Sequence, residues 1–459
     1  MFQYKPLAAA ILTLVSIQAL ADDSTSTQLQ SGIENVAEVL QTTAGFSTAT
    51  QDQTGDDNDA FADQQDGVGT VTQTQNGEYN ASTGIQGTET ESQVTHNQTG
   101  EWNGAHSEQW FNQNSHANVT QNGNDNRAFS IQDTQTASTV NITQADSENI
   151  ADAEQLFGTG NTTTIDQSGT LNEAGTWQVD QTGSTISILQ SGGANIAYVD
   201  QSQGTGNQVE VFQSGETGYI EVWQTEQESS RANVDQGGGE LNELVVDQSF
   251  GSGNEASVTQ IGNTNAAWAD QYETTDSTTA VTQAGDSNLA LTYQEGENLS
   301  LTVNQTGNDN NVYASNWQGA QEGGQFGNDQ VVELSQNGNG NTANFTQEGN
   351  FNELYFDQEG DGNTLVVAQR DGGNLAEGYS EGTGNSVEID QSGSGNLSQT
   401  YQSAGGGNSA TIIQADMNNL SVVSQAGWSN QATVTQSNFR MTATVDQNGT
   451  GNTATVVQQ

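Results

Sequence analysis

The chain has 459 residues, a net charge of −52 and only 31% hydrophobic residues. So little apolar surface is typical of disordered proteins, and the length alone would suggest about two to four globular domains. Five basic residues stand against 57 acidic ones, which excludes nucleic acid as a partner because phosphate binding needs clustered Lys and Arg.

Residues 1–21 have the features of a cleaved signal peptide. Lys5 gives a basic start, an apolar stretch runs from Leu7 to Ile17, and Ala19-Leu20-Ala21 forms a small-residue cleavage signal. The apolar stretch is shorter than the roughly 20 residues that span a bilayer, and no later segment is a candidate membrane helix. We therefore expect an exported protein that is not embedded in a membrane, with residues 22–27 as a short leader. It contains no Cys, so disulfides do not stabilise it.

From Gln30 to Gln458, glutamine recurs at intervals of mostly eleven or twelve residues. The string Q-x-G-x-x-N occurs sixteen times in this register, for example from Gln30 to Asn35 and from Gln447 to Asn452. Disorder does not hold such a register. The period instead predicts one short supersecondary unit that is stacked many times.

Residues 184–201 show the unit clearly. Side chains alternate between the two faces of a strand, so Ile186, Ile188 and Gln190 share one face, followed by a Gly-containing turn. A second strand then turns Asn195, Ala197, Val199 and Gln201 inward. Large residues in one strand face small residues in the other, which lets two closely spaced sheets interdigitate.

We predict an all-β solenoid of about 19 stacked strand-turn-strand rungs, which form two facing parallel sheets. Successive rungs lie about 4.8 Å apart, which makes the stack roughly 90 Å long. Each Gln then lies above another Gln, and the side-chain amides form internal ladders together with the Asn residues. A buried amide is tolerated only when both its donor and its acceptor are used, and a continuous ladder uses both.

The repeats are expected over 28–318 and 331–459, with an irregular insertion at 319–330 where the glutamine period fails. A second imperfect region lies at 372–384, where Glu381 falls near the expected position of a Gln.

The repeat is similar to that of the curlin family, whose pattern reads S-x5-Q-x-G-x-[GN]-N-x-A-x3-Q. Ser184, Gln190, Gly192, Asn195 and Ala197 match it, as does Gln201. The resemblance covers essentially residues 28–459 and makes this chain an unusually long member. It implies a secreted functional amyloid subunit that polymerises on the cell surface as part of a biofilm matrix.

The resemblance also implies which residues carry self-assembly and which partners to expect. The self-templating positions correspond to Gln30, Asn35 and Gln41 at one end, to Gln190, Asn195 and Gln201 as an interior example, and to Gln436, Gln447, Asn452 and Gln458 at the other end. The expected partners are further copies of the chain, a nucleator subunit and an outer-membrane secretion channel.

Outward-facing positions leave alternatives open. Aspartates often precede the ladder Gln: Asp52, Asp63, Asp166, Asp200, Asp235, Asp247, Asp270, Asp357, Asp390 and Asp446. They form either a solvated face that prevents aggregation or rows that gather Ca²⁺ or Mg²⁺. Aromatic residues in the same register, Trp177, Phe212, Trp223, Tyr293, Trp317 and Tyr401, are either strand formers or sticking points for a polysaccharide or surface.

No enzyme motif is found, and we expect no catalytic residue, metal site or cofactor. His96, His106 and His116 are evenly spaced, but they stand at different distances from their Gln and so do not share a column. The second hypothesis for function is a monomeric extracellular solenoid that binds a target, of the adhesin or ice-binding type. Threonine pairs occur but do not hold the register that an ice-binding array needs.

Overall fold

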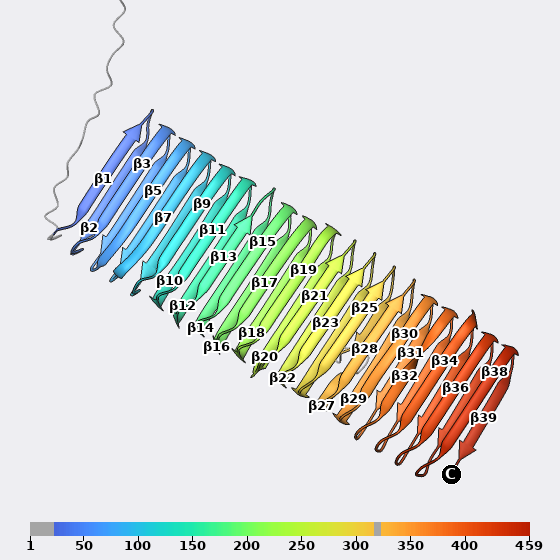
Figure 1. Cartoon of the computed structure of the whole chain (residues 1–459). Helices are drawn as coiled ribbons and strands as arrows, with labels where there is room; N and C mark the ends of the chain where they lie inside the picture. Colours follow the sequence, from blue (N-terminus) through green and yellow to red (C-terminus); the bar gives the residue numbers. More distant parts are fainter. Residues whose placement is uncertain (1–22, 316–322) are drawn as a thin grey trace, which may run out of the picture.

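The computed structural model describes residues 23–315 and 323–459, and within these ranges the chain consists of strands joined by turns. The strands stack into one straight rod that runs from the N-terminal to the C-terminal end (Figure 1). The signal-peptide prediction lies outside the described residues. No helix among the described residues is long and apolar enough to cross a membrane.

The strands form two parallel sheets that face each other. The first sheet consists of 19 strands: β1 (Thr25–Ser31), β3 (Thr48–Asp56), β5 (Val68–Glu78), β7 (Thr90–Glu101), β9 (His116–Asn124), β11 (Thr139–Ser147), β13 (Thr162–Gln167), β15 (Thr185–Gly193), β17 (Gln208–Glu216), β19 (Arg231–Glu240), β21 (Glu255–Ile261), β23 (Thr278–Ala284), β25 (Ser300–Thr306), β28 (Val331–Asn337), β30 (Glu353–Asp361), β32 (Leu375–Thr383), β34 (Leu397–Gly406), β36 (Leu420–Trp428) and β38 (Thr442–Thr450).

The second sheet alternates with the first along the chain. Its strands are β2 (Val36–Thr42), β4 (Asp59–Gln65), β6 (Ala81–Gly87), β8 (Gly104–Trp110), β10 (Arg127–Thr136), β12 (Ile150–Thr159), β14 (Glu173–Thr182), β16 (Ile196–Thr205), β18 (Tyr219–Glu228), β20 (Glu243–Ser252), β22 (Ala266–Thr275), β24 (Leu289–Glu297), β26 (Asn311–Ala314), β27 (Gly324–Asn328), β29 (Thr342–Asn350), β31 (Thr364–Gln369), β33 (Ser386–Gln391), β35 (Ser409–Gln414), β37 (Gln431–Gln436) and β39 (Thr453–Gln458).

One rung is a strand of the first sheet, a strand of the second and the turns that join them. Each strand pairs in parallel with the equivalent strand of the next rung, as when Gln190 of β15 pairs with Gln213 of β17. The predicted β-solenoid with two facing parallel sheets is confirmed. The turn glycine is required by close approach: Gly55 has φ +110°, and a Cβ there would lie 2.0 Å from the carbonyl oxygen of Gly77.

The core is a thin layer of aliphatic side chains between the sheets, flanked by amides. Ile142, Ile165 and Ile188 of the first sheet are at most 1% exposed, and they face small residues such as Ala151 and Ala153 of the second. The predicted packing of large first-sheet residues against small second-sheet residues holds in these rungs, whereas in β18 and β20 the second sheet carries the large residues, such as Ile220 and Leu244. The apolar core is divided near the N-terminal end, where a small group around Val71 and Val94 is separate from the main cluster.

The interruption near residue 320 splits one strand of the second sheet into two halves. Strand β24 pairs with β26 over residues 311–314 and with β27 over residues 325–328, and both halves then pair with β29. Residues 316–322 lie outside the described part. The range expected to be irregular, 319–330, therefore extends too far: from Gly324 the chain is again an in-register strand, because Gln325 occupies the ladder position.

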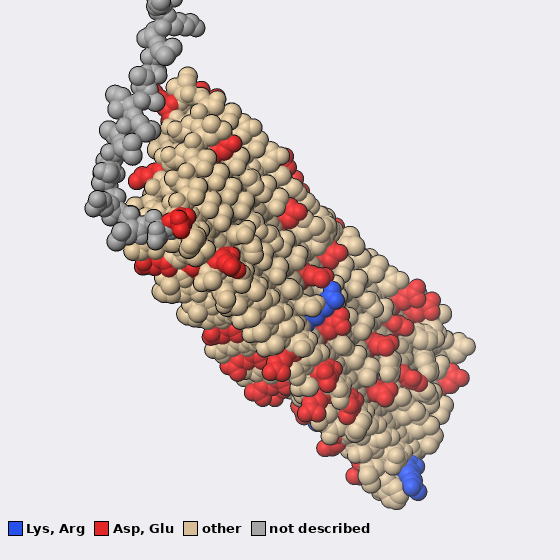
Figure 2. Space-filling model, turned by 60° about the vertical axis from the view of Figure 1, so that its left-hand side comes forward, with Lys and Arg blue, Asp and Glu red and all other residues tan. Residues whose placement is uncertain are grey.

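The N-terminal boundary also differs from the expectation. Strand β1 begins at Thr25, so part of the predicted leader, residues 22–27, already pairs with β3. Acidic side chains are scattered over the outside of the rod, and basic ones are few (Figure 2). Two exposed ion pairs, Arg231–Glu210 and Arg370–Asp390, occur on this surface.

Candidate functional site

Two columns of glutamine side chains, one in each sheet, run along the rod, and we call them the glutamine files. In each file the Nε2 atom of one Gln donates to the Oε1 atom of the Gln in the next rung, at 2.7–3.0 Å. The second-sheet file runs unbroken from Gln41 to Gln458. Gln190 and Gln201, predicted from the sequence, are interior members, and both are fully buried.

The same amides also hold the two sheets together. The Nε2 atom of Gln190 in β15 donates to the carbonyl oxygen of Glu173 in β14 at 3.0 Å, and the Nε2 atom of Gln201 in β16 donates to Thr185 in β15 at 3.3 Å. One N–H therefore bonds along the rod and the other across it. This uses both donors of the amide, which is why Gln is stable in the interior.

An asparagine file at the turn between the sheets runs in the opposite direction. The Nδ2 atom of Asn195 donates to Oδ1 of Asn172 in the preceding rung at 3.1 Å, and Asn452 donates in the same sense to Asn430 at 2.9 Å. The Oδ1 atom also accepts the backbone N–H of the following Asn. Glutamines thus donate toward the C-terminal end and asparagines toward the N-terminal end.

The end of the rod that carries β1 and β2, which we call the N-terminal face, presents unpaired amide acceptors. The Oε1 atoms of Gln30 and Gln41 accept no hydrogen bond from the described residues, although both side chains donate to the next rung. Asn35 presents the opposite group: its backbone N–H has no partner among the described residues, whereas inner members such as Asn58 and Asn80 donate theirs to the preceding Asn.

The other end, formed by β38 and β39 and called the C-terminal face, presents the complement. Gln447 and Gln458 use their Nε2 atoms only for the carbonyl oxygens of Gln431 and Thr442 across the rod. Their second N–H points along the file with no further residue to receive it. The Oδ1 atom of Asn452 accepts no bond among the described residues. At the ends of the two glutamine files and of the asparagine file, the donors of one face therefore match the acceptors of the other.

The first-sheet glutamine file is interrupted once, in β32. Ser380 takes the ladder position between Gln358 and Gln402: it pairs with both in register and is fully buried. Its hydroxyl donates to Oε1 of Gln402 at 2.8 Å. Glu381 falls near this position, as expected: it is the next residue along the strand and is exposed to solvent.

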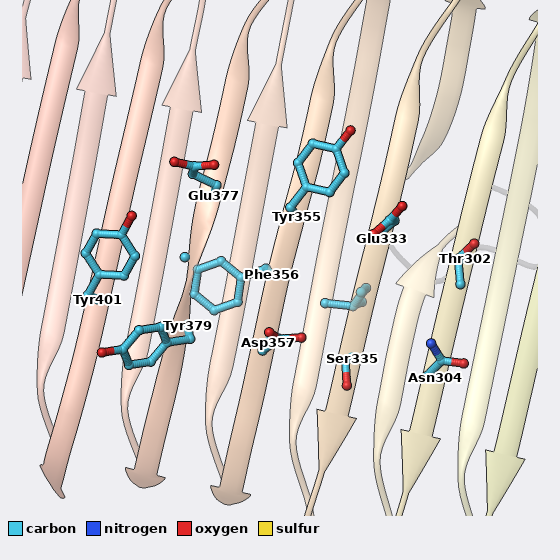
Figure 3. Close-up of a pocket in the computed structure, with 12 residues that line it drawn as sticks. Thr302, Asn304, Glu333, Ser335, Tyr355, Phe356, Asp357, Glu377, Tyr379 and Tyr401 are labelled. Atoms are coloured by element: carbon cyan, nitrogen blue, oxygen red, sulfur yellow. The ribbon is translucent and has the colours of Figure 1, made fainter.

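A groove of about 360 Å³ opens on the outer surface of the first sheet beside this interruption. Gly378 occupies an inner position without a side chain, between Phe356 and Thr400 in the same column. In Figure 3 the rings and carboxylates lie side by side on successive strands. The lining includes Tyr355, Tyr379, Tyr401, Glu333, Asp357 and Glu377. The rings of Tyr379 and Tyr401 are 5.4 Å apart.

A further set of buried amides was not anticipated from the sequence. Gln28, Gln51 and Gln73 form a short file two residues before the main one: Gln28 donates to Gln51 and Gln51 to Gln73, both at 2.9 Å. Gln51 and Gln73 are fully buried. The sequence does indicate this second file, because Gln-x-Gln occurs in three consecutive first-sheet strands and residues two apart share a face of a strand.

His96 follows this second file in the same column and is completely buried. Its Nδ1 atom lies 2.9 Å from Oγ of Ser82, and its Nε2 atom lies 2.7 Å from Oγ of Ser107, both in the second sheet. Burial, with a smaller contribution from His106, lowers the pKa of His96 to about 3. The imidazole is thus neutral and bridges two rungs. His106 and His116 lie in other columns, as predicted, and no cluster of three or more metal-binding side chains occurs in the described part of the chain.

The aspartates before the ladder Gln do not form rows. Asp200 lies between Trp177 and Trp223, and most of the others have uncharged cross-strand neighbours. Asp247 and Asp270 are the exception, because they pair directly. Burial, and then the charge of Asp247, raises the pKa of Asp270 to about 7. The sequence hypothesis of rows of carboxylates for Ca²⁺ or Mg²⁺ lacks the stacked geometry that it assumed.

The chain contains repeats of the curlin family. The curlin associated repeat matches residues 251–285 and 274–307, which together contain β21 to β25. No curated protein matches the chain significantly. The register of Gln, Gly and Asn in the matched rungs continues through the rest of the rod, so the same repeat builds both sheets along their length.

Proposed function

We propose that this protein is an exported structural subunit that stacks end to end into extracellular, curli-like amyloid fibres, which serve biofilm matrix, adhesion and surface attachment. The observation that carries the proposal is the complementarity of the two faces. A second copy placed on the C-terminal face would continue both glutamine files, because Gln447 would donate to Gln30 and Gln458 to Gln41. Asn35 would donate to Asn452 in the opposite sense.

The edge of a parallel sheet also favours addition of a further rung. Each terminal strand has a row of backbone N–H and C=O groups without a partner strand, and cross-β stacking satisfies them. The net charge of −52 opposes the approach of two copies. Salt weakens this repulsion, since it shortens the Debye length to about 8 Å at physiological ionic strength.

The test is fibre growth by purified protein that lacks residues 1–21. We expect fibres that bind an amyloid dye, that seed their own growth and that grow faster at 0.5 M than at about 0.05 M NaCl. Replacement of Gln447 and Gln458 by Ala together should slow elongation about tenfold or more, because each leaves an acceptor of the incoming copy unpaired. Thr455→Ala, on the outer side of β39, is the matched control. Protein that stays monomeric for days at high salt would refute the proposal.

Export and partners are part of the proposal. The signal-peptide pattern of residues 1–21 supports secretion, and the family supports a nucleator subunit and an outer-membrane secretion channel as further partners. Fibres located on the surface of the producing cell by immunogold labelling would support this placement, and retention of the protein inside the cell would contradict it.

The tyrosine-lined groove supports a second candidate, a monomeric solenoid that binds a target. Aromatic rings beside carboxylates suit the faces and hydroxyl groups of a sugar chain. Retention of the protein on insoluble cellulose, lost in the Tyr379→Ala, Tyr401→Ala double variant but not in Tyr313→Ala, would favour this function. Equal retention of all three proteins would reject it.

A further inference from the structure

The two faces of the rod match in the inner columns of the second sheet and in the first-sheet glutamine file. In the second sheet, Ala454, Val456 and Gln458 of β39 would lie over Ala37, Val39 and Gln41 of the next copy. In the first sheet, Gln447 of β38 would lie over Gln30 of β1. The column two residues earlier differs: the C-terminal face presents Val445, whereas the N-terminal face presents Gln28.

Gln28 is the outermost amide of a file that is anchored inside the rod. Gln51 donates to the carbonyl oxygens of Glu38 and Ala60, each at 3.0 Å, and Gln73 donates to Phe61 at 2.8 Å and to Ser82 at 3.0 Å. Because Gln28 donates to Gln51, its Oε1 atom is held toward the open face. This atom accepts no hydrogen bond from the described residues.

The file of Gln28, Gln51 and Gln73 is not explained as a polar cap that keeps the end of the rod soluble. A cap needs a polar outer rung, but Gln51 and Gln73 are fully buried in the second and third rungs. In the second sheet the carbonyl oxygens of Ala60 and Ser82 accept from the Nε2 atoms of Gln51 and Gln73. Two buried rungs therefore contain amides that bond to both sheets.

Within the chain, the change from amides to aliphatic residues in this column passes through His96. The imidazole bonds to Ser82 and Ser107 of the opposite sheet, and Val119 follows in the next rung. Where two copies stack end to end, Val445 of one copy would lie directly on Gln28 of the next. No residue like His96 would separate the aliphatic side chain from the amide. The Oε1 atom of Gln28 would then be buried against methyl groups, and a buried acceptor without a partner is destabilising.

We propose that the N-terminal face selects for a partner rung with Gln at both inner positions of the strand that stacks on β1. Such a rung supplies one amide N–H to Gln30 and a second to Gln28. The preferred occupant is the C-terminal rung of a different repeat polypeptide with Gln-x-Gln at this place, in preference to the C-terminal face of a second copy. This inference rests on the proposed end-to-end assembly.

The test introduces a glutamine at position 445, where the C-terminal face has no amide to offer Gln28. Seeds are prepared from wild-type protein, from Val445→Gln and from Val445→Gln with Val456→Ala, where the second change reproduces the small residues found opposite Gln51 and Gln73. Addition of wild-type monomer to each kind of seed is then measured by single-fibre microscopy. The matched control is Val456→Gln, which puts an amide on the same face opposite Val39. Circular dichroism and melting confirm that each variant folds.

We expect wild-type monomer to add to at least one Val445→Gln seed roughly tenfold faster than to wild-type seeds, which corresponds to one buried amide acceptor regained. Val456→Gln seeds should show no gain. Equal rates on all seeds, or an equal gain with Val456→Gln, would overturn the inference and leave end-to-end assembly intact. Growth only on Val445→Gln seeds would support the inference and contradict homopolymerisation by the wild-type protein.

Discussion

A ladder glutamine such as Gln190 is stabilised by three hydrogen bonds to three different strands. It accepts from Gln167 at 2.9 Å, donates to Gln213 at 2.8 Å and donates to the carbonyl oxygen of Glu173 at 3.0 Å. Its interior position thus depends on neighbours in two rungs and in both sheets. An isolated rung could not bury this side chain without leaving polar atoms unpaired.

Replacement of Gln190 by Ala should therefore destabilise the rod strongly. The change leaves one N–H of Gln167 and the Oε1 atom of Gln213 without partners, at a cost of about 3 kcal/mol or more. Thermal melting and hydrogen exchange at the neighbouring rungs measure the loss. Ser187→Ala, on the exposed side of the same strand, should change the stability by less than about 0.5 kcal/mol. Similar effects of the two substitutions would contradict the role of the file.

His96 predicts a defined pH dependence. Its pKa in the folded protein is about 3, below the value of about 6.5 in an unfolded chain. Between these values the unfolded state binds a proton that the folded state does not, so this residue makes the folded protein less stable as the pH falls from about 6.5 to about 3. His96→Val, which copies Val119 of the same column, should reduce this slope in melting temperature against pH. His116→Gln should leave it unchanged.

At the level of single strands, β32 shows how an interrupted ladder is accommodated. The hydroxyl of Ser380 replaces one amide bond, and the pairing between β32 and β34 slips after this residue. Ser380→Gln should restore a continuous file from Gln358 to Gln402 and raise stability by about 1 kcal/mol, measured as a higher melting temperature. Glu381→Gln changes only an exposed position and should have no such effect. A loss of stability in Ser380→Gln would show that β32 is shaped for the smaller residue.

The pair of Asp247 and Asp270 on β20 and β22 predicts an opposite pH effect. The pKa of Asp270 is raised to about 7, above the unfolded value of about 4. The folded state therefore binds more protons between these values, and this contribution to stability is lost as the pH rises from about 4 to about 7. Asp270→Asn should be more stable than wild type at pH 8, with the difference gone at pH 4. Asp446→Asn, at an exposed equivalent position, should show no comparable gain.

Strand pairing was largely predictable, because one Gln per strand sets the register and the alternation of faces then places every inner residue. The errors have local causes. Ser380 occupies a ladder position without a glutamine, so the sequence pattern indicated only that the region around Glu381 is imperfect. The broken strand of β26 and β27 restarts at Gly324 within a stretch that reads as loop. The role of His96 depends on hydroxyl groups of the opposite sheet, and the direction of each amide bond is set by packing that no period encodes.

For the whole molecule, stability resembles that of a one-dimensional stack, in which each rung contacts only its neighbours. The charge is spread over the full length of the rod (Figure 2). Like charges on successive rungs repel one another, and salt screens this repulsion.

Added NaCl should therefore raise the melting temperature, whether or not fibres form. CaCl₂ at matched ionic strength should give the same increase, because the outward aspartates mostly alternate with uncharged residues and do not stack. Melting by circular dichroism at dilute protein concentration measures both. A clear excess effect of Ca²⁺, with saturable heat in a calorimetric titration, would instead support specific divalent sites.

The opposed directions of the amide files have an electrical consequence for a growing fibre. Each amide aligned with the rod axis contributes a small dipole, and a file of one kind alone would add these dipoles with every rung. Because asparagines point one way and glutamines the other, the dipoles partly offset each other, and parallel strands themselves contribute little. A long filament therefore polarises less along its axis than its number of aligned amides would suggest.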